Sequence, residues 1–119
     1  MAKQFYVKYY NIDGGQFKGE NMSGPYTMAT IGRDRECNIT SNSKYVSRKH
    51  GILMFKHKTF GEHLVFRDDS GNGTQIIQLK SGRAKINLIK GDEKEVNPGD
   101  WIMISPDGES GILLKVSYN

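Results

Sequence analysis

The sequence predicts an all-β domain, built as a two-layer sandwich or as a barrel. Glycine occurs 14 times in 119 residues, and turn signals containing glycine recur at short intervals. Between these turns lie short runs rich in Val, Ile, Tyr, Phe and Thr, and several alternate apolar with polar residues as half-buried strands do. No stretch of ten or more residues has the apolar spacing of an amphipathic helix. Many short strands separated by turns are typical of sandwiches and barrels.

The strands can be assigned in chain order from this pattern. The predicted strands are 4–11, 26–32, 50–56, 63–67, 74–78, 85–89, 101–105 and 112–118. Residues 114–118 alternate apolar with polar, whereas residues 102–104 are continuously apolar. The turn-favouring clusters that separate the runs are 13–15, 24–25, 71–73, 91–92, 97–100 and 106–108.

The composition indicates one globular domain. Hydrophobic residues make up 36% of the chain and charged residues 25%, which is typical of a folded protein. The chain contains no linker, repeat or low-complexity tract, so we expect a single domain over residues 1–119. Its formal net charge of +4 favours anionic partners in general. Charge alone does not choose between nucleic acid, a membrane surface and a phosphoprotein.

Several classes of site lack support in the sequence. Cys37 is the only cysteine, so we expect neither an internal disulfide nor a zinc site built from cysteines. His57 and His63 do not have metal-ligand spacing, and no phosphate-binding loop of the nucleotide triphosphatases is present. We therefore expect no metal and no cofactor. Because no signal peptide or membrane-length apolar run is found, we expect a cytoplasmic protein that does not bind membranes.

Three predicted loops carry the residue types that bind a phosphate group: 31–33, 46–50 and 70–74. A phosphomonoester carries about −1.5 to −2 charges and three strong acceptor oxygens. Arginine offers a charged fork of donors, serine a short hydroxyl and asparagine both donors and an acceptor, while glycine lets backbone N–H groups approach closely. From Arg33 to His50, five basic residues outnumber two acidic ones, so this region holds most of the excess positive charge.

The order of these motifs resembles the forkhead-associated (FHA) domain family. Gly-Arg at 32–33 is followed by Ser-Arg-x-His at 47–50 and by Ser-x-Asn-Gly-Thr at 70–74. Residues 96–102 resemble the Gly-Asp stretch of that family's final hairpin, so the resemblance covers about residues 26–105. It implies a two-sheet β-sandwich of about eleven strands, with recognition loops at one end.

The resemblance also implies roles for individual residues. Arg33, Ser47 and Arg48 would contact the phosphate of a phosphothreonine, Asn72 would hold the peptide backbone, and Gly71 would lie beside the phosphothreonine. The residues that would support the site from within the fold are Gly32, His50, Gly73 and Thr74.

Two features depart from the family pattern. Ile77 stands where a second asparagine is common, and residues 78–95 resemble an added hairpin with Gly82 and Gly91 as turn residues. Both departures leave the phosphate-binding set intact and concern how the flanking peptide is read.

The resemblance implies a phosphothreonine-dependent protein interaction module in Ser/Thr kinase signalling, whose partner is a kinase or a kinase substrate. The alternative is a phosphate-independent interaction or self-association module on the same fold. Nucleic-acid binding ranks third, because Tyr9, Tyr10 and Tyr45 do not interleave with basic residues as in single-strand binders. Ser47 and His50 could suggest a hydrolase, but the sequence locates no orienting carboxylate or oxyanion hole, so we expect no enzyme activity.

Overall fold

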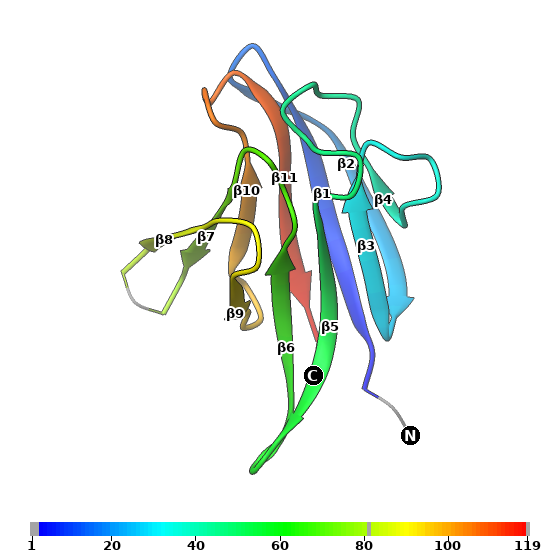
Figure 1. The fold of residues 1–119 in the computed structure, drawn as a ribbon, viewed down its shortest axis with the longest axis vertical. Helices are drawn as coiled ribbons and strands as arrows, with labels where there is room; N and C mark the ends of the chain where they lie inside the picture. Colours follow the sequence, from blue (N-terminus) through cyan, green and yellow to red (C-terminus); the bar gives the residue numbers. More distant parts are fainter. Residues whose placement is uncertain (1–2, 81, 119) are drawn as a thin grey trace.

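The computed structural model describes residues 3–80 and 82–118, and this part of the chain folds into eleven β-strands (Figure 1). In chain order the strands are β1 (Phe5–Asp13), β2 (Gln16–Tyr26), β3 (Met28–Gly32), β4 (Ile39–Thr40), β5 (Gly51–Lys58), β6 (Gly61–Asp68), β7 (Thr74–Gln78), β8 (Ala84–Leu88), β9 (Glu93–Glu95), β10 (Trp101–Ile104) and β11 (Ser110–Ser117).

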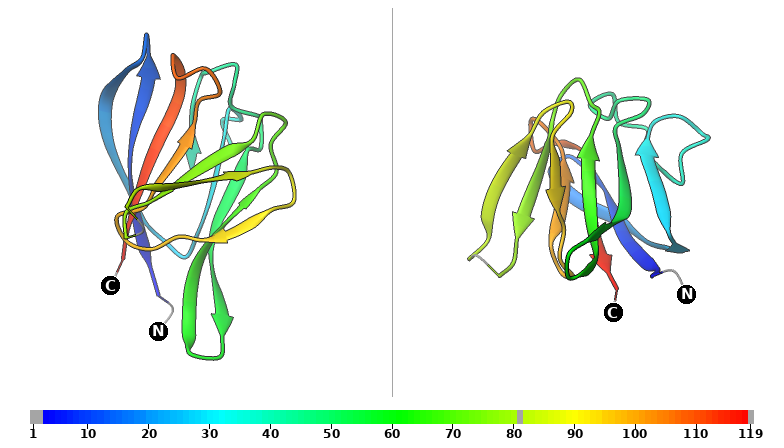
Figure 2. Two further views of the ribbon diagram at one scale, coloured as in Figure 1. Left: turned by 90° about the vertical axis from the view of Figure 1, so that its left-hand side faces the viewer. Right: turned by 60° about the horizontal axis from the view of Figure 1, so that its bottom comes forward.

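The strands form two sheets that pack face to face (Figure 2). The six-stranded sheet has the order β2-β1-β11-β10-β7-β8, and the five-stranded sheet has the order β4-β3-β5-β6-β9. Neighbouring strands whose register is known are antiparallel, except that β3 and β4 run parallel. The prediction of an all-β, two-sheet sandwich of about eleven strands is therefore confirmed.

The hydrophobic core lies between the sheets and follows the period of two that strands impose. On β11, Ile112, Leu114 and Val116 are fully buried, while Lys115 between them is exposed. The core also requires a glycine, because a Cβ atom at Gly51 would lie 2.3 Å from the ring of Phe66. The other residues of the core cluster are Phe5, Val7, Ala29, Ile31, Ile39, Val46, Leu53, Leu64, Ile76, Leu88, Val96, Ile102 and Ile104.

Each predicted strand corresponds to an observed one, with shifts of a few residues at the ends. The prediction of 74–78 matches β7 in full, and 63–67 lies inside β6. The prediction of 26–32 was wrong at its start, because Tyr26 ends β2 and β3 begins at Met28. The predicted turn at Gly24 and Pro25 was also wrong, since both residues lie within β2.

Three strands were not predicted, namely β2, β4 and β9. β2 is an edge strand with almost no buried side chain, so it lacks the apolar alternation that reveals a strand. β4 and β9 have two and three residues, which is too short for any pattern.

The expected added hairpin at residues 78–95 is only partly correct. β8 does pair with β7 in an antiparallel hairpin, and Gly82 and Gly91 adopt positive φ angles of 66° and 94° in connecting segments. However, β9 pairs with β6 in the other sheet, so β8 and β9 do not form a hairpin with each other. The segment therefore crosses from one layer of the sandwich to the other.

The loops that carry the three motifs lie at the same end of the sandwich (Figure 1). They follow β3, precede β5 and join β6 to β7. The described residues include no helix long and apolar enough to cross a membrane.

Candidate functional site

The loop after β3 and the loop before β5 lie against each other through backbone hydrogen bonds. The N–H of Arg33 donates to the carbonyl of Ser47 at 3.0 Å, and the N–H of Asp34 donates to the carbonyl of Arg48 at 3.2 Å. Gly32 permits this approach, because a Cβ atom there would lie 2.0 Å from the carbonyl oxygen of Arg48. The two arginines of the motifs are thereby brought to neighbouring positions.

The Arg33 and Arg48 side chains line one open depression of about 300 Å³ together with Asp34. The Nε of Arg33 donates to the carbonyl of Val46 at 2.5 Å, which directs the guanidinium toward the loop before β5. Among the described residues, neither arginine forms an ion pair with a carboxylate. The Asp34 carboxylate accepts a hydrogen bond from the N–H of Glu36 at 3.1 Å. The depression thus contains two cations and one anion, and it can attract a phosphate.

Ser47 links this depression to the loop between β6 and β7. Its Oγ accepts a hydrogen bond from the N–H of Gly71 at 3.0 Å. A hydroxyl group that accepts one bond can still donate its own hydrogen. Gly71 itself is exposed, and a Cβ atom there would meet only the Ser47 Oγ, at 3.9 Å.

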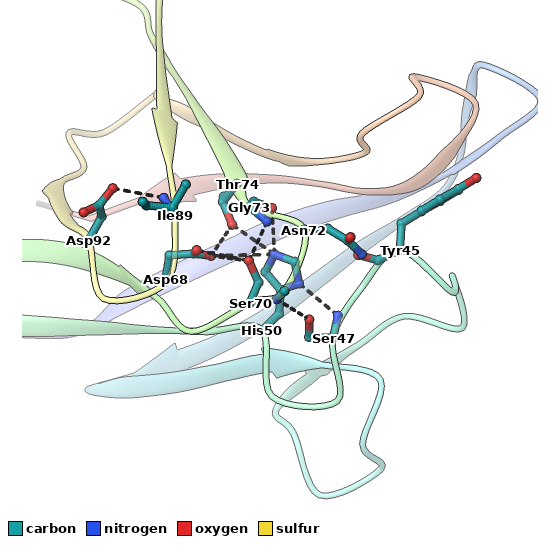
Figure 3. Close-up of polar contacts among 11 residues, drawn as sticks. Tyr45, Ser47, His50, Asp68, Ser70, Asn72, Gly73, Thr74, Ile89 and Asp92 are labelled. Carbon is teal, nitrogen blue, oxygen red and sulfur yellow. Dashed lines mark hydrogen bonds and ion pairs between the residues drawn. The ribbon is translucent and has the colours of Figure 1, made fainter.

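His50 lies fully buried beneath these loops (Figure 3). Its Nδ1 accepts a hydrogen bond from the N–H of Ser47 at 3.0 Å, so the ring proton lies on Nε2. Nε2 then donates to Thr74 Oγ1 at 3.0 Å and to the carbonyl of Gly73 at 3.1 Å. Burial lowers the pKa of His50, which keeps the ring neutral. The imidazole thus ties the loop before β5 to the start of β7.

Asp68 is the centre of this buried network (Figure 3). Its carboxylate accepts hydrogen bonds from Ser70 Oγ at 2.8 and 3.0 Å and from Thr74 Oγ1 at 2.7 Å. Ser70 Oγ in turn accepts a hydrogen bond from the N–H of Gly73 at 2.8 Å. Among the described residues, every buried side-chain nitrogen or oxygen has a hydrogen-bond partner. The turn at 70–74 is therefore held rigid from below.

Asp68 was not identified from the sequence, although a signal was present. It follows Leu64 and Phe66 at intervals of two, and both of those side chains are fully buried. An acidic residue in phase with buried apolar residues must find hydrogen-bond donors inside the fold. The hydroxyl groups of Ser70 and Thr74 supply them.

Asn72 projects from the turn between β6 and β7 toward the loop before β5. Its Nδ2 donates to the carbonyl of Tyr45 at 3.1 Å. This bond fixes the orientation of the side chain and uses one of its two amide hydrogens. The backbone N–H groups of Gly71 and Gly73 are also bonded within the protein. This loop therefore offers the Asn72 side chain to a ligand rather than those two N–H groups.

A groove of about 280 Å³ begins at Asn72 and continues along the sheet. Its lining comes from three neighbouring strands of the six-stranded sheet, β8, β7 and β10, and from the turns beside them. The lining residues are Asn72, Gly73, Thr74, Gln75, Asn87, Leu88, Ile89, Met103, Ser105 and Pro106. The segment at 78–95 therefore reaches the recognition end through β8.

The structure brings together Arg33, Ser47, Arg48, Gly71 and Asn72, with Gly32, His50, Gly73 and Thr74 directly behind them. Ile77 does not belong to this group. It pairs with Trp101 and Lys85 across the six-stranded sheet, and the neighbouring Ile76 occupies the core.

Ser47 and His50 are not arranged as a nucleophile and its base. The bond to His50 Nδ1 comes from the backbone of Ser47, and the Ser47 hydroxyl oxygen accepts a bond from Gly71. His50 Nε2 lies 3.8 Å from Asp68 Oδ1, with Thr74 bonded to both groups. In a serine triad, by contrast, the hydroxyl hydrogen-bonds to the imidazole. The contacts of Ser47 and His50 instead hold the loop before β5 against the loop between β6 and β7.

Comparisons with known proteins match the fold of this chain to one family. The family model of the FHA domain matches residues 29–104, which is more than half of the chain. No curated protein matches the chain closely in sequence.

Solved structures share the fold at low sequence identity. Full-length yeast Pml1p is 16% identical with a TM-score of 0.75, over 98% of this chain and 83% of that chain. The MEK1 FHA domain in complex with a HOP1 phosphothreonine peptide is 16% identical with a TM-score of 0.62, over 95% of this chain and 96% of that chain. The FHA2 domain of Rad53, complexed with a phosphotyrosyl peptide from Rad9, is 19% identical with a TM-score of 0.69, over 98% of this chain and 78% of that chain. The matched family model, the two-sheet fold and the ordered motifs together identify the chain as a member of the FHA domain family.

Proposed function

We propose that this FHA domain binds a phosphothreonine-containing segment of a partner protein, and that it acts by binding rather than by catalysis. The observation that carries the proposal is the depression lined by Arg33 and Arg48, with Ser47 preceding Arg48 in the chain and its hydroxyl bonded to the loop between β6 and β7. Two FHA domains with this fold have been solved with phosphopeptides, namely MEK1 with HOP1 and Rad53 FHA2 with Rad9. The partner would be a Ser/Thr kinase or a kinase substrate in the cytoplasm.

In this proposal the phosphate dianion enters the depression and accepts charge-assisted hydrogen bonds from Arg33 and Arg48. Each such bond contributes about 1.5–3 kcal/mol. Ser47 donates its hydroxyl hydrogen to a phosphate oxygen, while its own oxygen stays bonded to Gly71. The backbone contacts between the loops fix the positions from which these side chains extend, so little backbone ordering is required when the ligand binds.

Asn72 would hold the peptide backbone beside the phosphothreonine. Its side-chain oxygen can accept a hydrogen bond from a peptide N–H while Nδ2 remains bonded to Tyr45. The peptide would then continue over the groove that begins at Asn72, where Met103 and Leu88 offer apolar surface to a flanking side chain.

Selection of threonine over serine depends on one methyl group. Simple burial of a methyl contributes about 0.8 kcal/mol, or roughly fourfold in affinity. A shaped pocket can raise this to about 1–3 kcal/mol. The turn at 70–74 is the candidate wall, because the Asp68 and His50 network keeps it rigid.

A screen of an oriented phosphothreonine peptide library tests the proposal, with the same library carrying phosphoserine and with no phosphate as controls. We expect a selected sequence that binds in the phosphothreonine form, more weakly in the phosphoserine form and not in the unphosphorylated form. Equal retention of the phosphorylated and unphosphorylated libraries would instead favour a phosphate-independent interaction module.

A further inference from the structure

The outer face of the six-stranded sheet carries a row of side chains that the phosphopeptide site does not use. Strand pairing aligns Lys8 on β1 with Lys115 on β11, and Lys115 with Trp101 on β10. Trp101 in turn pairs with Ile77 on β7, and Ile77 pairs with Lys85 on β8. We call these five residues the lysine–tryptophan row.

The row faces away from the core. Its strand neighbours Val7, Ile76, Ile102, Leu114 and Val116 are fully buried between the sheets. Since successive side chains on a strand point to opposite faces, the row lies on the outside. Lys85 and Lys115 are exposed, and Trp101 and Ile77 are half-buried. In Figure 2 the five-stranded sheet covers only the other face of this sheet.

A second row on the same face lies between this surface and the recognition loops, and its Met103, Gln75 and Asn87 line the groove assigned above to the phosphopeptide. The adjacent row aligns Tyr10 with Leu113, Met103, Gln75 and Asn87 through the same strand pairs. A shallow hollow beside Trp101 is lined by Ile77, Leu79, Arg83 and Gly99. Aromatic side chains are enriched at protein–protein interfaces, whose rims are polar, and here the half-buried Trp101 has basic residues around it.

The charge of the face is one-sided. Glu20 lies 3.6 Å from Lys8 and accepts a hydrogen bond from the Tyr10 hydroxyl at 2.6 Å, so one lysine is already neutralised. Within the described part of the chain, Lys85 and Lys115 have no carboxylate within ion-pair distance. Lys115 lies beside Trp101, Lys85 lies beside Ile77, and Arg83 lines the hollow at Trp101, so an acidic partner would complement this face.

We propose that the lysine–tryptophan row is a second docking surface, which binds an acidic protein segment carrying an apolar side chain. The apolar side chain packs against Trp101 and Ile77, and flanking carboxylates pair with Lys115 and Lys85. The row crosses five strands, which is about 19 Å at the usual strand spacing and matches about six extended residues.

Other occupants fit the face less well. A second copy of this chain would bring lysines against lysines, which is unfavourable. Single-stranded nucleic acid stacks successive bases on several aromatic side chains. Here the row holds one aromatic ring, and the hydroxyl of Tyr10 is bonded to the anionic Glu20.

Trp101 makes the proposal directly testable, because it is the only tryptophan in the chain and its fluorescence reports on this face alone. The probe is a short peptide of Glu and Asp interrupted by two leucines, titrated into the full chain at low salt. The comparison peptides replace the acidic residues by Gln and Asn, or the leucines by serine. We expect a saturable change in Trp101 fluorescence with the first peptide only.

The variants Lys85→Gln and Lys115→Gln, alone and combined, should weaken binding of the acidic peptide by roughly two- to fivefold per lysine, as expected for exposed ion pairs. The charge-matched double variant Lys58→Gln with Lys94→Gln, in the five-stranded sheet, should leave it unchanged. Binding of the library-selected phosphothreonine peptide should be the same in all these variants. This comparison separates the second surface from the phosphopeptide site.

Three results would overturn the proposal. The first is the absence of a fluorescence change with the acidic peptide. The second is equal weakening by the control double variant, which would mean that only net charge matters. The third is tighter binding of oligothymidylate or of vesicles rich in phosphatidylserine, which would assign the face to nucleic acid or to a membrane.

Discussion

Ser47 connects its own loop to the two neighbouring loops through both its backbone and its side chain. Its backbone carbonyl accepts a bond from Arg33, its N–H donates to His50, and its Oγ accepts a bond from Gly71. Only the hydroxyl oxygen and its hydrogen depend on the side chain. Replacing this residue therefore tests the proposed phosphate donor while the backbone bonds remain.

The variant Ser47→Ala should weaken binding of the selected phosphothreonine peptide by about tenfold, equivalent to about 1.4 kcal/mol. It removes a donor to the phosphate and also frees the N–H of Gly71. Fluorescence anisotropy with a labelled peptide measures the change. Ser117→Ala, at an exposed position of β11, is the control and should bind as the unaltered protein does. An unchanged titration for Ser47→Ala would remove Ser47 from the site.

Asp34 is the one residue of the phosphate depression whose charge opposes the proposed ligand. Asp34→Asn keeps an oxygen that can accept the bond from Glu36 but removes the negative charge. We expect binding to strengthen by about two- to fivefold at low salt, because measured interactions between exposed charges contribute about 1 kcal/mol or less. Raising the salt concentration should shrink the difference. Weaker binding of Asp34→Asn would show that the carboxylate contacts the peptide.

The residues of the site were accessible from the sequence to different degrees. Arg33, Ser47, Arg48 and Asn72 stand in motifs whose order can be read along the chain. The contacts that position them could not be predicted, because they join residues distant in sequence. Asn72 and Tyr45 are 27 residues apart, and neither local sequence indicates that the Asn72 amide donates to the Tyr45 carbonyl.

At the scale of elements, the site depends on how closely the end of β3 approaches the loop before β5. Only glycine fits at position 32, because a Cβ atom there would lie 2.0 Å from the backbone oxygen of Arg48. Gly32→Ala should lower the free energy of unfolding by about 1–3 kcal/mol, as overpacking does. It should also weaken peptide binding by moving Arg33 away from Ser47.

Urea unfolding measures the Gly32→Ala effect, with Gly71→Ala as the matched control. A Cβ at Gly71 has open space, with its nearest contact at 3.9 Å. Neither glycine has a positive φ, so the comparison isolates the steric contact. If the two variants were equally stable, the close approach of the two loops would not be a requirement of the fold.

The strands differ in how clearly the sequence predicts them, because only strands with buried side chains show a regular apolar pattern. β7, β10 and β11 contribute alternate residues to the core, so their apolar pattern is visible. β2 is an edge strand held by backbone hydrogen bonds to β1. Because none of its side chains is buried, its sequence shows no alternation of apolar and polar residues. β9 has only three residues, and its pairing with β6 follows a crossing between the sheets that no local signal encodes.

At the scale of the whole molecule, the buried His50 links stability to pH. Burial lowers the pKa of His50 in the folded protein, whereas in the unfolded chain it is about 6.5. Below about pH 6.5 the unfolded state therefore binds a proton that the folded state excludes. The free energy of unfolding should fall as the pH decreases from 7 to 5, by at most about 1.4 kcal/mol per pH unit.

Urea unfolding at pH 5, 6 and 7 measures this dependence. His50→Gln should be less stable at pH 7 and should lose this part of the pH dependence. His57→Gln, at an exposed position, should keep it. A pH dependence that is the same in His50→Gln and in the unaltered protein would contradict the role given to the buried imidazole.

The central claim is that the domain binds a phosphothreonine through Arg33. Isothermal titration of the library-selected peptide, in its phosphothreonine and threonine forms, into the unaltered protein and into Arg33→Ala tests it most directly. Arg35→Ala, an equal change of charge on the same loop, is the control. We predict binding of the phosphorylated form only, weakened at least about tenfold by Arg33→Ala and little by Arg35→Ala. Equal affinity for both forms of the peptide, or equal effects of the two arginine variants, would contradict the claim.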